Sequence, residues 1–318
     1  MQKREFAYNS SDGKTKIHAI IWAPDKNQEF RAVLQIAHGI TEYIERYDAL
    51  ATFLVSKGFV VIGNDHIGHG MSVAEDAPNM YFGPKGSWKH VVKDMKYIRD
   101  FARKAFPTLP YAMLGFSLGS YLVRTYLIDY PDSVDAAIIM GSGDKSTAEI
   151  NIGLLAAGVA KLIGGEDDES DFVDYLTFDT YNKHFAPNRT GFDWLCSDRK
   201  SLDAYIADRK RGNFVTPGLF REMLNGMKYT ADPNNVCKMN KKMSILFVSG
   251  EDDPVGDFGK GVEKAYTTFI RAGLRDTTLM LYPKLRHDIL HEANRQEIYA
   301  YLHEWLEAKL PKTGSVKR

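Results

Sequence analysis

Cysteine is scarce in this chain, since only Cys196 and Cys237 occur among 318 residues and they form no Cys-x-x-Cys pair. This scarcity argues against a disulfide framework and against a thiolate zinc site, so we expect free thiols. Cys196 lacks the strand-turn-helix setting of a catalytic nucleophile, and we expect it to pack in the interior or to lie at the surface.

Long hydrophobic runs are also lacking. The N-terminal segment has no apolar core of a signal peptide, and no run approaches the ~18 apolar residues that a membrane span needs. An excess of either charge is missing too, because Lys plus Arg and Asp plus Glu both total 41. No overall charge therefore attracts nucleic acid or an anionic membrane surface. We expect a soluble, cytoplasmic protein that does not bind nucleic acid.

Short, nearly all-apolar segments alternate with segments of helical periodicity over most of the chain. Such runs are typical of strands covered on both faces, so the alternation predicts an α/β fold with a doubly wound, mostly parallel sheet. Residues 6–22 predict an antiparallel hairpin at the sheet edge, because the Asp12-Gly13 pair is a turn signal. The predicted strands are residues 32–37, 59–63, 136–140, 244–249, 277–282 and a run from Tyr111; the predicted helices include 47–57, 88–106 with Ser87 as N-cap, 261–272 and 295–309.

The alternation lapses over residues 142–243, where aromatic side chains are frequent. We interpret this interval as an inserted helical cap, and residues 1–141 and 244–318 as the α/β core. Residues 150–163 predict a cap helix that is apolar nearly all round. It is either a buried helix or a lid whose outer face takes acyl chains or touches a lipid interface. The acidic residues 166–171 lack the ligand spacing of a calcium loop and would be repelled by an anionic bilayer, so we expect at most transient contact with lipid interfaces.

The segment from Tyr111 to Val123 organises the rest of the chain, because a short apolar run ends in Gly115-Phe116-Ser117-Leu118-Gly119 and a helical pattern begins at once. A serine on such a strand-turn-helix unit is held with its hydroxyl above the sheet, beside the N–H groups of a helix N-terminus. The two glycines allow the close approach of strand and helix. Ser117 is therefore the candidate nucleophile, the alternative being a helix N-cap in a glycine-rich loop.

A serine nucleophile needs a base and an acid that orients the base, and both follow later strands. The strand that ends at Ser249 is followed by Glu251, Asp252 and Asp253, and the strand that ends at Tyr282 is followed by His287. The chain order Ser, Asp, His is that of the α/β-hydrolases. Asp253 is the chosen acid because Pro254 restricts its backbone, with Asp252 as the competitor. His291 is expected to hydrogen-bond locally.

These motifs together resemble the monoacylglycerol lipase and lysophospholipase branch of the serine α/β-hydrolases, a serine-aminopeptidase-like group. The resemblance covers nearly the whole chain and implies an α/β-hydrolase fold. It selects Asp253 as the acid, since the family's acid stands three residues after the strand-end glycine. It also implies that the backbone N–H groups of Ile40 and Leu118 form an oxyanion hole, which suits a strand-end turn and a helix start. The matching pieces are residues 38–43, 65–72, 115–119, 250–255 and 286–292.

His38, His66 and His69 cluster near strand ends and raise the question of a metal. No helical His-x-x-x-His pair or cysteine partner accompanies them, and in the resembling family these histidines shape loops beneath the site. We expect no metal and no organic cofactor.

The sequence thus predicts a serine carboxylic-ester hydrolase that acts on single-acyl-chain lipids, a monoacylglycerol or a lysophospholipid, or on shorter esters. A peptidase or amidase would use the same triad but needs a buried acid facing the nucleophile, and Glu149, Asp174 and Glu222 are its candidates. A non-catalytic binding protein on the same fold is a third alternative. The residues expected to contact the substrate are Leu154, Leu155, Trp194, Phe214 and Phe220.

Overall fold

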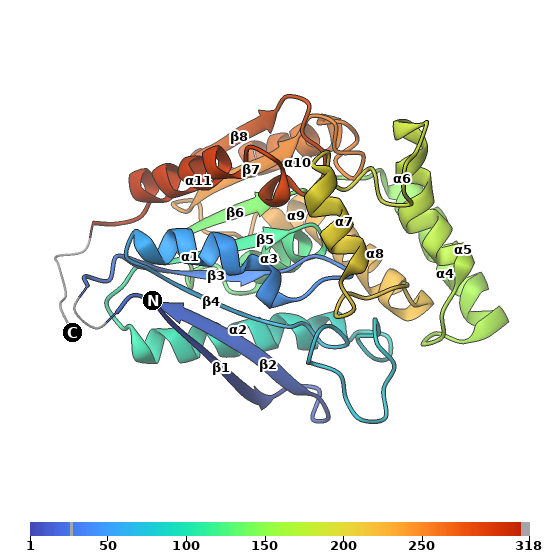
Figure 1. Ribbon diagram of the computed structural model, residues 1–318, viewed down its shortest axis with the longest axis horizontal. Helices are drawn as coiled ribbons and strands as arrows, with labels where there is room; N and C mark the ends of the chain where they lie inside the picture. The colour runs from blue at the N-terminus through green and yellow to red at the C-terminus, as the bar shows by residue number, and fades with distance from the viewer. Residues whose placement is uncertain (26–27, 313–318) are drawn as a thin grey trace.

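The computed structural model describes residues 1–25 and 28–312, and its central feature is a sheet with the strand order β1-β2-β4-β3-β5-β6-β7-β8 (Figure 1). The strands from β3 onward are parallel, while β2 pairs antiparallel with both β1 and β4. This confirms the predicted α/β fold and its antiparallel edge hairpin. The strand bounds are β1 Gln2–Asn9, β2 Lys16–Ala23, β3 Ala32–Ala37, β4 Phe59–Asn64, β5 Tyr111–Phe116, β6 Ala136–Met140, β7 Ser244–Gly250 and β8 Thr277–Tyr282.

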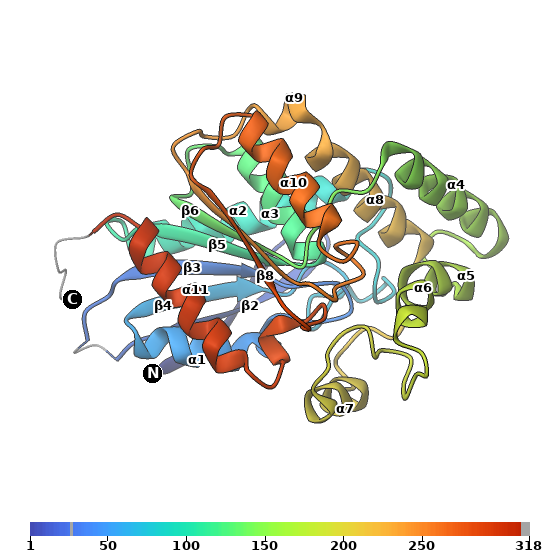
Figure 2. The same ribbon diagram turned by 90° about the horizontal axis from the view of Figure 1, so that it is seen from above.

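Helices cover both faces of the sheet, as the predicted doubly wound fold requires (Figure 2). One face is covered by α1 (Asp48–Ser56) and α11 (Arg295–Lys309), and the other by α2 (Trp88–Ala105), α3 (Leu118–Asp129) and α10 (Lys260–Arg271). Alternate residues of the inner strands pack into the two cores. Leu34 and Ile36 of β3 belong to the core under α1 and α11, whereas Val33 belongs to the core under α2 and α3.

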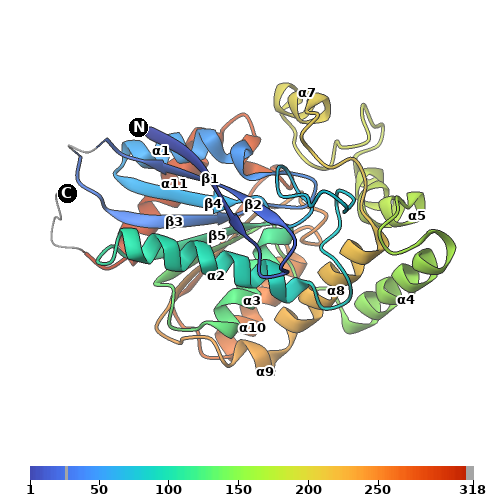
Figure 3. The same ribbon diagram turned by 90° about the horizontal axis from the view of Figure 1, so that it is seen from below.

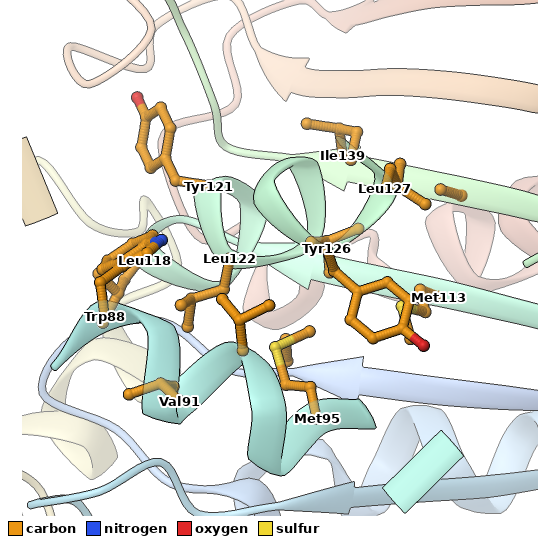
Figure 4. Close-up of a cluster of buried hydrophobic side chains, with 14 of the residues drawn as sticks. Trp88, Val91, Met95, Met113, Leu118, Tyr121, Leu122, Tyr126, Leu127 and Ile139 are labelled. Carbon is orange, nitrogen blue, oxygen red and sulfur yellow. The ribbon is translucent and has the colours of Figure 1, made fainter. Parts of the chain in front are cut away.

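The side chains between α2, α3 and the sheet form a dense core that includes Leu118, the first residue of α3 (Figure 4). Val91 and Met95 of α2 and Leu122 of α3 are fully or almost fully buried. Because buried side chains interlock at near-crystalline density, this core fixes the position of the first turn of α3.

Helix α2 begins at Trp88 with Ser87 at its N-cap position, as predicted, but the side chain of Ser87 does not cap the helix. Ser87 makes no capping hydrogen bond, since its hydroxyl donates to the carbonyl of Pro84. The carboxylate of Glu222 instead accepts the N–H groups of Gly86 and Trp88 at 3.1 and 3.0 Å. A negative charge stabilises a helix N-terminus, so Glu222 replaces the serine. Glu222 is buried in α8 (Pro217–Ala231) and joins that helix to the α/β core.

Between β6 and β7 the described chain contains helical elements that extend beyond the carboxyl ends of the strands (Figure 1). Helix α8 packs against α3, and α4 packs against α8. These two helices therefore form two successive layers beside α3. The elements of the interval are α4 Thr147–Gly164, α5 Asp171–Asp174, the π-helix η2 Tyr175–Asp179, α6 Thr180–Asn182, the 3-10 helix η3 Lys183–Phe185, α7 Arg199–Ala207, α8 and α9 Pro233–Val236.

Helix α4 lies on the outside of the cap (Figure 3). Its inner face is buried at Ile150, Ala157 and Ala160, while Leu155 and Leu162 on the opposite face are 70% and 87% exposed. By length and composition it is apolar enough to cross a membrane, with a mean hydropathy of 1.3 over 18 residues, contrary to the expectation that no such run exists. One face of α4 is therefore packed on α8, and the opposite, apolar face is exposed to solvent.

Candidate active site

Ser117 sits at the junction of β5 and α3 with a backbone φ of 52°, a left-handed conformation that non-glycine residues seldom adopt. Its N–H donates to the carbonyl of Met140 at 2.9 Å, which ties the turn to β6. A Cβ atom at Gly115 would collide with the carbonyl of Gly119, and one at Gly119 would collide with that of Ala37. The two glycines are therefore required by close backbone approach, as predicted.

His287 lies in the loop after β8 and is 1% exposed. Its imidazole packs between the rings of Phe116 and Trp194, with centroid separations of 4.8 and 5.3 Å. Gly141 follows β6 with a φ of 57°, and a Cβ atom there would lie 3.0 Å from Cε1 of His287. Sequence reasoning missed Gly141, although a glycine directly after a strand end is the signal that a neighbour approaches closely.

Asp253 is fully buried after β7, and both of its carboxylate oxygens lie 2.9 Å from Nδ1 of His287. The carboxylate also accepts the hydroxyl of Ser249 at 2.8 Å and the N–H of Val255 at 2.9 Å. Burial alone would raise the pKa of this carboxyl, but His287 and the hydrogen bonds hold the pKa below its ordinary value. Asp252, the competing acid, is exposed. The geometry thus brings Asp253, and not Asp252, to the imidazole.

Two residues are predicted to supply oxyanion donors: Leu118 directly follows Ser117 in the chain, and Ile40 lines the same cavity as Ser117. Leu118 is the first residue of α3, and Ile40 follows β3 in a turn. Within residues 1–25 and 28–312, neither the N–H of Ile40 nor that of Leu118 donates to a protein acceptor. Both donors are therefore free to bind an oxygen of a substrate.

Ser117 and His287 line one cavity of about 20 Å³. A cavity of that size holds roughly one water molecule. Two residues of the cap, Phe178 of η2 and Trp194, line this cavity. Their rings stack at a centroid distance of 6.1 Å. An acyl chain does not fit unless these cap side chains move.

Of the five side chains expected to contact substrate, Trp194 alone lines this cavity in the described structure. Leu154 is half-buried against the core cluster, and Leu155 is exposed on the outer face of α4. Phe214 lines a different cavity of about 250 Å³, beside Tyr43 and His69. Phe220 is buried in α8. A contact between these four residues and an acyl chain stays a prediction.

The acids considered for binding a substrate amine do not line the cavity with Ser117. Glu149 caps α4 through the N–H of Ser146, and Asp174 accepts the N–H of Val215 at 2.7 Å. Glu222 caps α2 as described above. Two other carboxylates, Glu42 and Asp288, do line the cavity.

Sequence reasoning missed the hydrogen bonds and ion pairs made by Glu42 and Asp288. The carboxylate of Glu42 accepts the N–H of Gly39 at 2.5 Å and pairs with Arg46 at 3.3 Å. Asp288 pairs with His291 at 2.8 Å and with Arg46 at 3.6 Å, which confirms the local role expected for His291. The arginine thus links the turn after β3 to the loop that carries the imidazole.

The remaining reactive side chains show no metal-binding arrangement in the described part of the chain. The rings of His38 and His66 are in contact, with their centroids 4.0 Å apart. Burial lowers the pKa of His66 to about 3 and that of His69 to about 4, so these imidazoles are neutral. Cys196 is buried as a free thiol, and burial raises its pKa well above the ordinary value, as suits a packing residue.

The chain is similar to known proteins in sequence. A family model described as serine aminopeptidase, S33, matches residues 28–294. Monoglyceride lipase of Homo sapiens is 34% identical over 298 residues, which are 90% of this chain and 85% of that protein. Monoacylglycerol lipase of Mycolicibacterium smegmatis is 25% identical over 305 residues, covering 94% and 95% of the two chains.

Solved structures show the same fold. A thermostable carboxyl esterase from Bacillus coagulans in complex with glycerol superposes with a TM-score of 0.89 at 22% identity, covering 97% of this chain and 99% of that one. A soluble variant of monoglyceride lipase from Saccharomyces cerevisiae superposes with a TM-score of 0.74 at 19% identity, covering 96% of both chains.

Proposed function

The chain belongs to the serine aminopeptidase S33 family of serine hydrolases, and we propose that it hydrolyses carboxylic esters with one acyl chain. The substrates we propose are monoacylglycerols, lysophospholipids or shorter esters. The observation that carries the proposal is the contact of Asp253 with His287. The imidazole of His287 is buried and lines the same cavity as Ser117. The names of the similar proteins, monoglyceride lipases and a carboxyl esterase, support ester chemistry.

In the proposed mechanism the hydroxyl oxygen of Ser117 attacks the ester carbonyl while Nε2 of His287 takes its proton. The negative charge that develops on the carbonyl oxygen is stabilised by the N–H groups of Ile40 and Leu118. His287 then gives its proton to the leaving alcohol, and an acyl-enzyme ester remains on Ser117. Water attacks this ester by the same route and releases the carboxylic acid. Asp253 keeps Nδ1 of the imidazole protonated throughout, and no metal or cofactor takes part.

Amide hydrolysis is the alternative that the same residues permit. The three acids considered for binding an amine lie elsewhere, and the two carboxylates in the cavity are already bonded to Arg46 and to other groups. A free carboxylate for a substrate ammonium is therefore lacking among the described cavity residues. This favours an ester without a charged amine over an aminoacyl amide.

The exposed face of α4 suggests how a lipid substrate reaches the enzyme. Ile152, Leu155, Leu162 and Ile163 are each more than two-thirds exposed, and apolar surface of this kind is buried favourably at a lipid interface. The neighbouring acidic residues 166–171 disfavour an anionic surface. We therefore propose transient contact of this face with an uncharged lipid interface. A cytoplasmic location stays a prediction.

The proposal is tested by turnover of esters from acetyl to palmitoyl with glycerol or glycerophosphocholine as the alcohol, beside an aminoacyl amide. We expect ester turnover to exceed amide turnover by orders of magnitude, and a fluorophosphonate probe to label the protein at Ser117. Amide turnover equal to ester turnover would favour the peptidase alternative. Absence of both labelling and turnover in folded protein would favour a binding protein.

A further inference from the structure

Two short segments from distant parts of the chain meet next to the candidate oxyanion hole. Residues 41–46, here called the turn segment, follow Ile40, and residues 205–210, the cap segment, span the end of α7. Thr41 Oγ1 lies 2.8 Å from the hydroxyl of Tyr205. The contact continues along both segments, because the hydroxyl of Tyr43 donates to Asp208 at 2.6 Å and Nζ of Lys210 donates to Glu45 at 2.8 Å.

Thr41 has an unusual backbone conformation, with a φ of 58°. This left-handed region is unfavourable for a β-branched residue, so surrounding contacts must hold Thr41 there. Its hydroxyl donates to the carbonyl of Ile40 at 2.7 Å and therefore accepts the proton of Tyr205. On the other side of Ile40, the N–H of Gly39 is held by Glu42. The free N–H of Ile40 thus lies between two residues that are held by hydrogen bonds, Gly39 and Thr41. The hydrogen bond at Thr41 comes from Tyr205 of the cap segment.

The side chain of Tyr205 is restrained by its neighbours, so the position of its hydroxyl is fixed. The side chain is 5% exposed. Its ring is contacted by the guanidinium carbons of Arg46 and Arg211 at 4.8 and 5.1 Å, and by the ring of Phe192 at 5.6 Å. Cations over an aromatic face and an edge-on ring both restrict its rotation.

We propose that Tyr205 is a positioning residue for the oxyanion hole. Its hydroxyl holds Thr41 in the left-handed conformation, and this conformation keeps the N–H of Ile40 directed at the carbonyl oxygen of the substrate. The cap therefore contributes to the chemical step as well as covering the substrate. This inference rests on the proposed ester hydrolysis.

The test replaces Tyr205 by Phe, which keeps the aromatic ring and removes only the hydroxyl. Loss of one oxyanion donor typically costs 10²–10³-fold in kcat, and a donor that is loosened rather than lost should cost about tenfold. We expect kcat to fall by that factor and KM to stay within about twofold. The inhibition constant of a trifluoromethyl ketone, which forms an oxyanion on the serine, should rise by the same factor as kcat/KM falls.

Tyr43→Phe is the matched control, because it removes a hydroxyl from the same pair of segments but leaves Thr41 and Ile40 untouched. We expect wild-type kcat for this variant. Thr41→Val should cost at least as much kcat as Tyr205→Phe, because it removes the hydrogen bond to Tyr205 and also the one to the carbonyl of Ile40. Adding Tyr205→Phe to Thr41→Val should cause no further loss, since the partner of the Tyr205 hydroxyl is already gone. Thr41→Val also tests the inference if Tyr205→Phe fails to fold.

Glyceryl and methyl esters of one fatty acid separate this role from direct substrate binding. An equal fall in kcat for both esters is expected. A fall confined to the glyceryl ester would overturn the inference, because it would place the hydroxyl of Tyr205 on the leaving alcohol. Wild-type kcat in stable Tyr205→Phe would overturn it as well. Neither result touches the proposed function, which fails instead if Ser117→Ala retains ester turnover.

Discussion

Both carboxylate oxygens of Asp253 lie 2.9 Å from Nδ1 of His287, and both side chains are buried. Because the pKa of Asp253 is held below its ordinary value, the carboxylate is ionised at neutral pH and can only accept hydrogen bonds. Nδ1 therefore carries the proton, and Nε2 presents its lone pair. That tautomer is the one a general base needs.

Asp253→Asn should lower kcat by about 10⁴-fold while the protein stays folded, because an amide can stabilise the wrong imidazole tautomer. The measurement is kcat for a short ester, with the thermal midpoint as the check on folding. Asp252→Asn is the matched control: its side chain is exposed one residue away, and wild-type turnover is expected. If Asp252→Asn proved the damaging change, the choice of acid would be wrong although the mechanism would survive.

Ser117→Ala should lower ester turnover by about 10⁶-fold, to the residual rate that binding and oxyanion donors alone provide. The same change should abolish labelling by a fluorophosphonate probe. Alanine removes the nucleophile without filling space, so the thermal midpoint should stay close to that of wild type. If Ser117→Ala, verified by mass spectrometry, kept turnover within tenfold of wild type, the assignment of Ser117 as the nucleophile would be wrong.

The features predicted correctly from the sequence are those that local pattern specifies. The residues of β3 and β8 form the strands expected for them, because runs of apolar and β-branched residues between turns leave little alternative. Candidate site residues follow the same logic. Ser117 comes directly after β5, Asp253 lies in the loop after β7 and His287 in the loop after β8, and parallel strands bring their carboxyl ends to one edge of the sheet.

The features that sequence reasoning missed depend on contacts between distant residues. Serine at a helix start predicts a cap, yet Glu222 caps α2 in place of Ser87 from more than a hundred residues away. The contact of Thr41 with Tyr205 likewise joins segments 164 positions apart. Helix α4 is apolar nearly all round, so its periodicity did not show which face packs on α8.

Phe178→Ala should widen the catalytic cavity and change the preference for acyl groups. The phenyl ring stacks on Trp194, which packs on His287, so the ring limits the space above Ser117. Each further methylene that becomes buried is worth about 0.8 kcal/mol, so kcat/KM for a branched acyl ester relative to acetyl should rise about tenfold. Phe172→Ala, in the exposed part of the same region, is the control and should leave the ratio unchanged. An unchanged ratio in folded Phe178→Ala would mean that the acyl group binds elsewhere.

Asp94 should make stability depend on pH. Burial raises its pKa to about 6, while its carboxylate accepts the hydroxyl of Ser10 at 2.6 Å and the N–H of Ser11 at 2.8 Å. The folded state therefore keeps a proton that the unfolded state has released from about pH 4 upward. The contribution of Asp94 to the free energy of unfolding is therefore complete below about pH 4 and is lost as the pH rises through about 6.

Asp94→Asn removes this titration and serves as the reference. Between about pH 5 and pH 8, the free energy of unfolding of wild type should fall by about 1.4 kcal/mol relative to the variant. Denaturant unfolding at several pH values measures the difference. A difference that does not vary with pH would show that Asp94 titrates at its ordinary pKa.

The exposed apolar face of α4 is expected to bind lipid interfaces. Leu155 and Leu162 are 70% and 87% exposed, so serine at both positions costs little in folding, whereas Leu154 packs inward and its loss would disturb the cap. A leucine side chain buried at an interface contributes about 1.5–3 kcal/mol. Leu155→Ser with Leu162→Ser should therefore weaken binding to uncharged phosphatidylcholine vesicles at least about tenfold.

The same double variant should lose turnover only where substrate is presented at an interface. We expect kcat/KM for a long-chain monoacylglycerol above its critical micelle concentration to fall about tenfold, and kcat for dissolved butyryl ester to stay at the wild-type value, because the cavity around Ser117 is unchanged. Vesicles with added anionic lipid should bind wild type less well than uncharged ones, since residues 166–171 lie beside α4. Equal losses on both esters would place the two leucines in the acyl site itself, and wild-type behaviour on both would leave this face without a role in lipid binding.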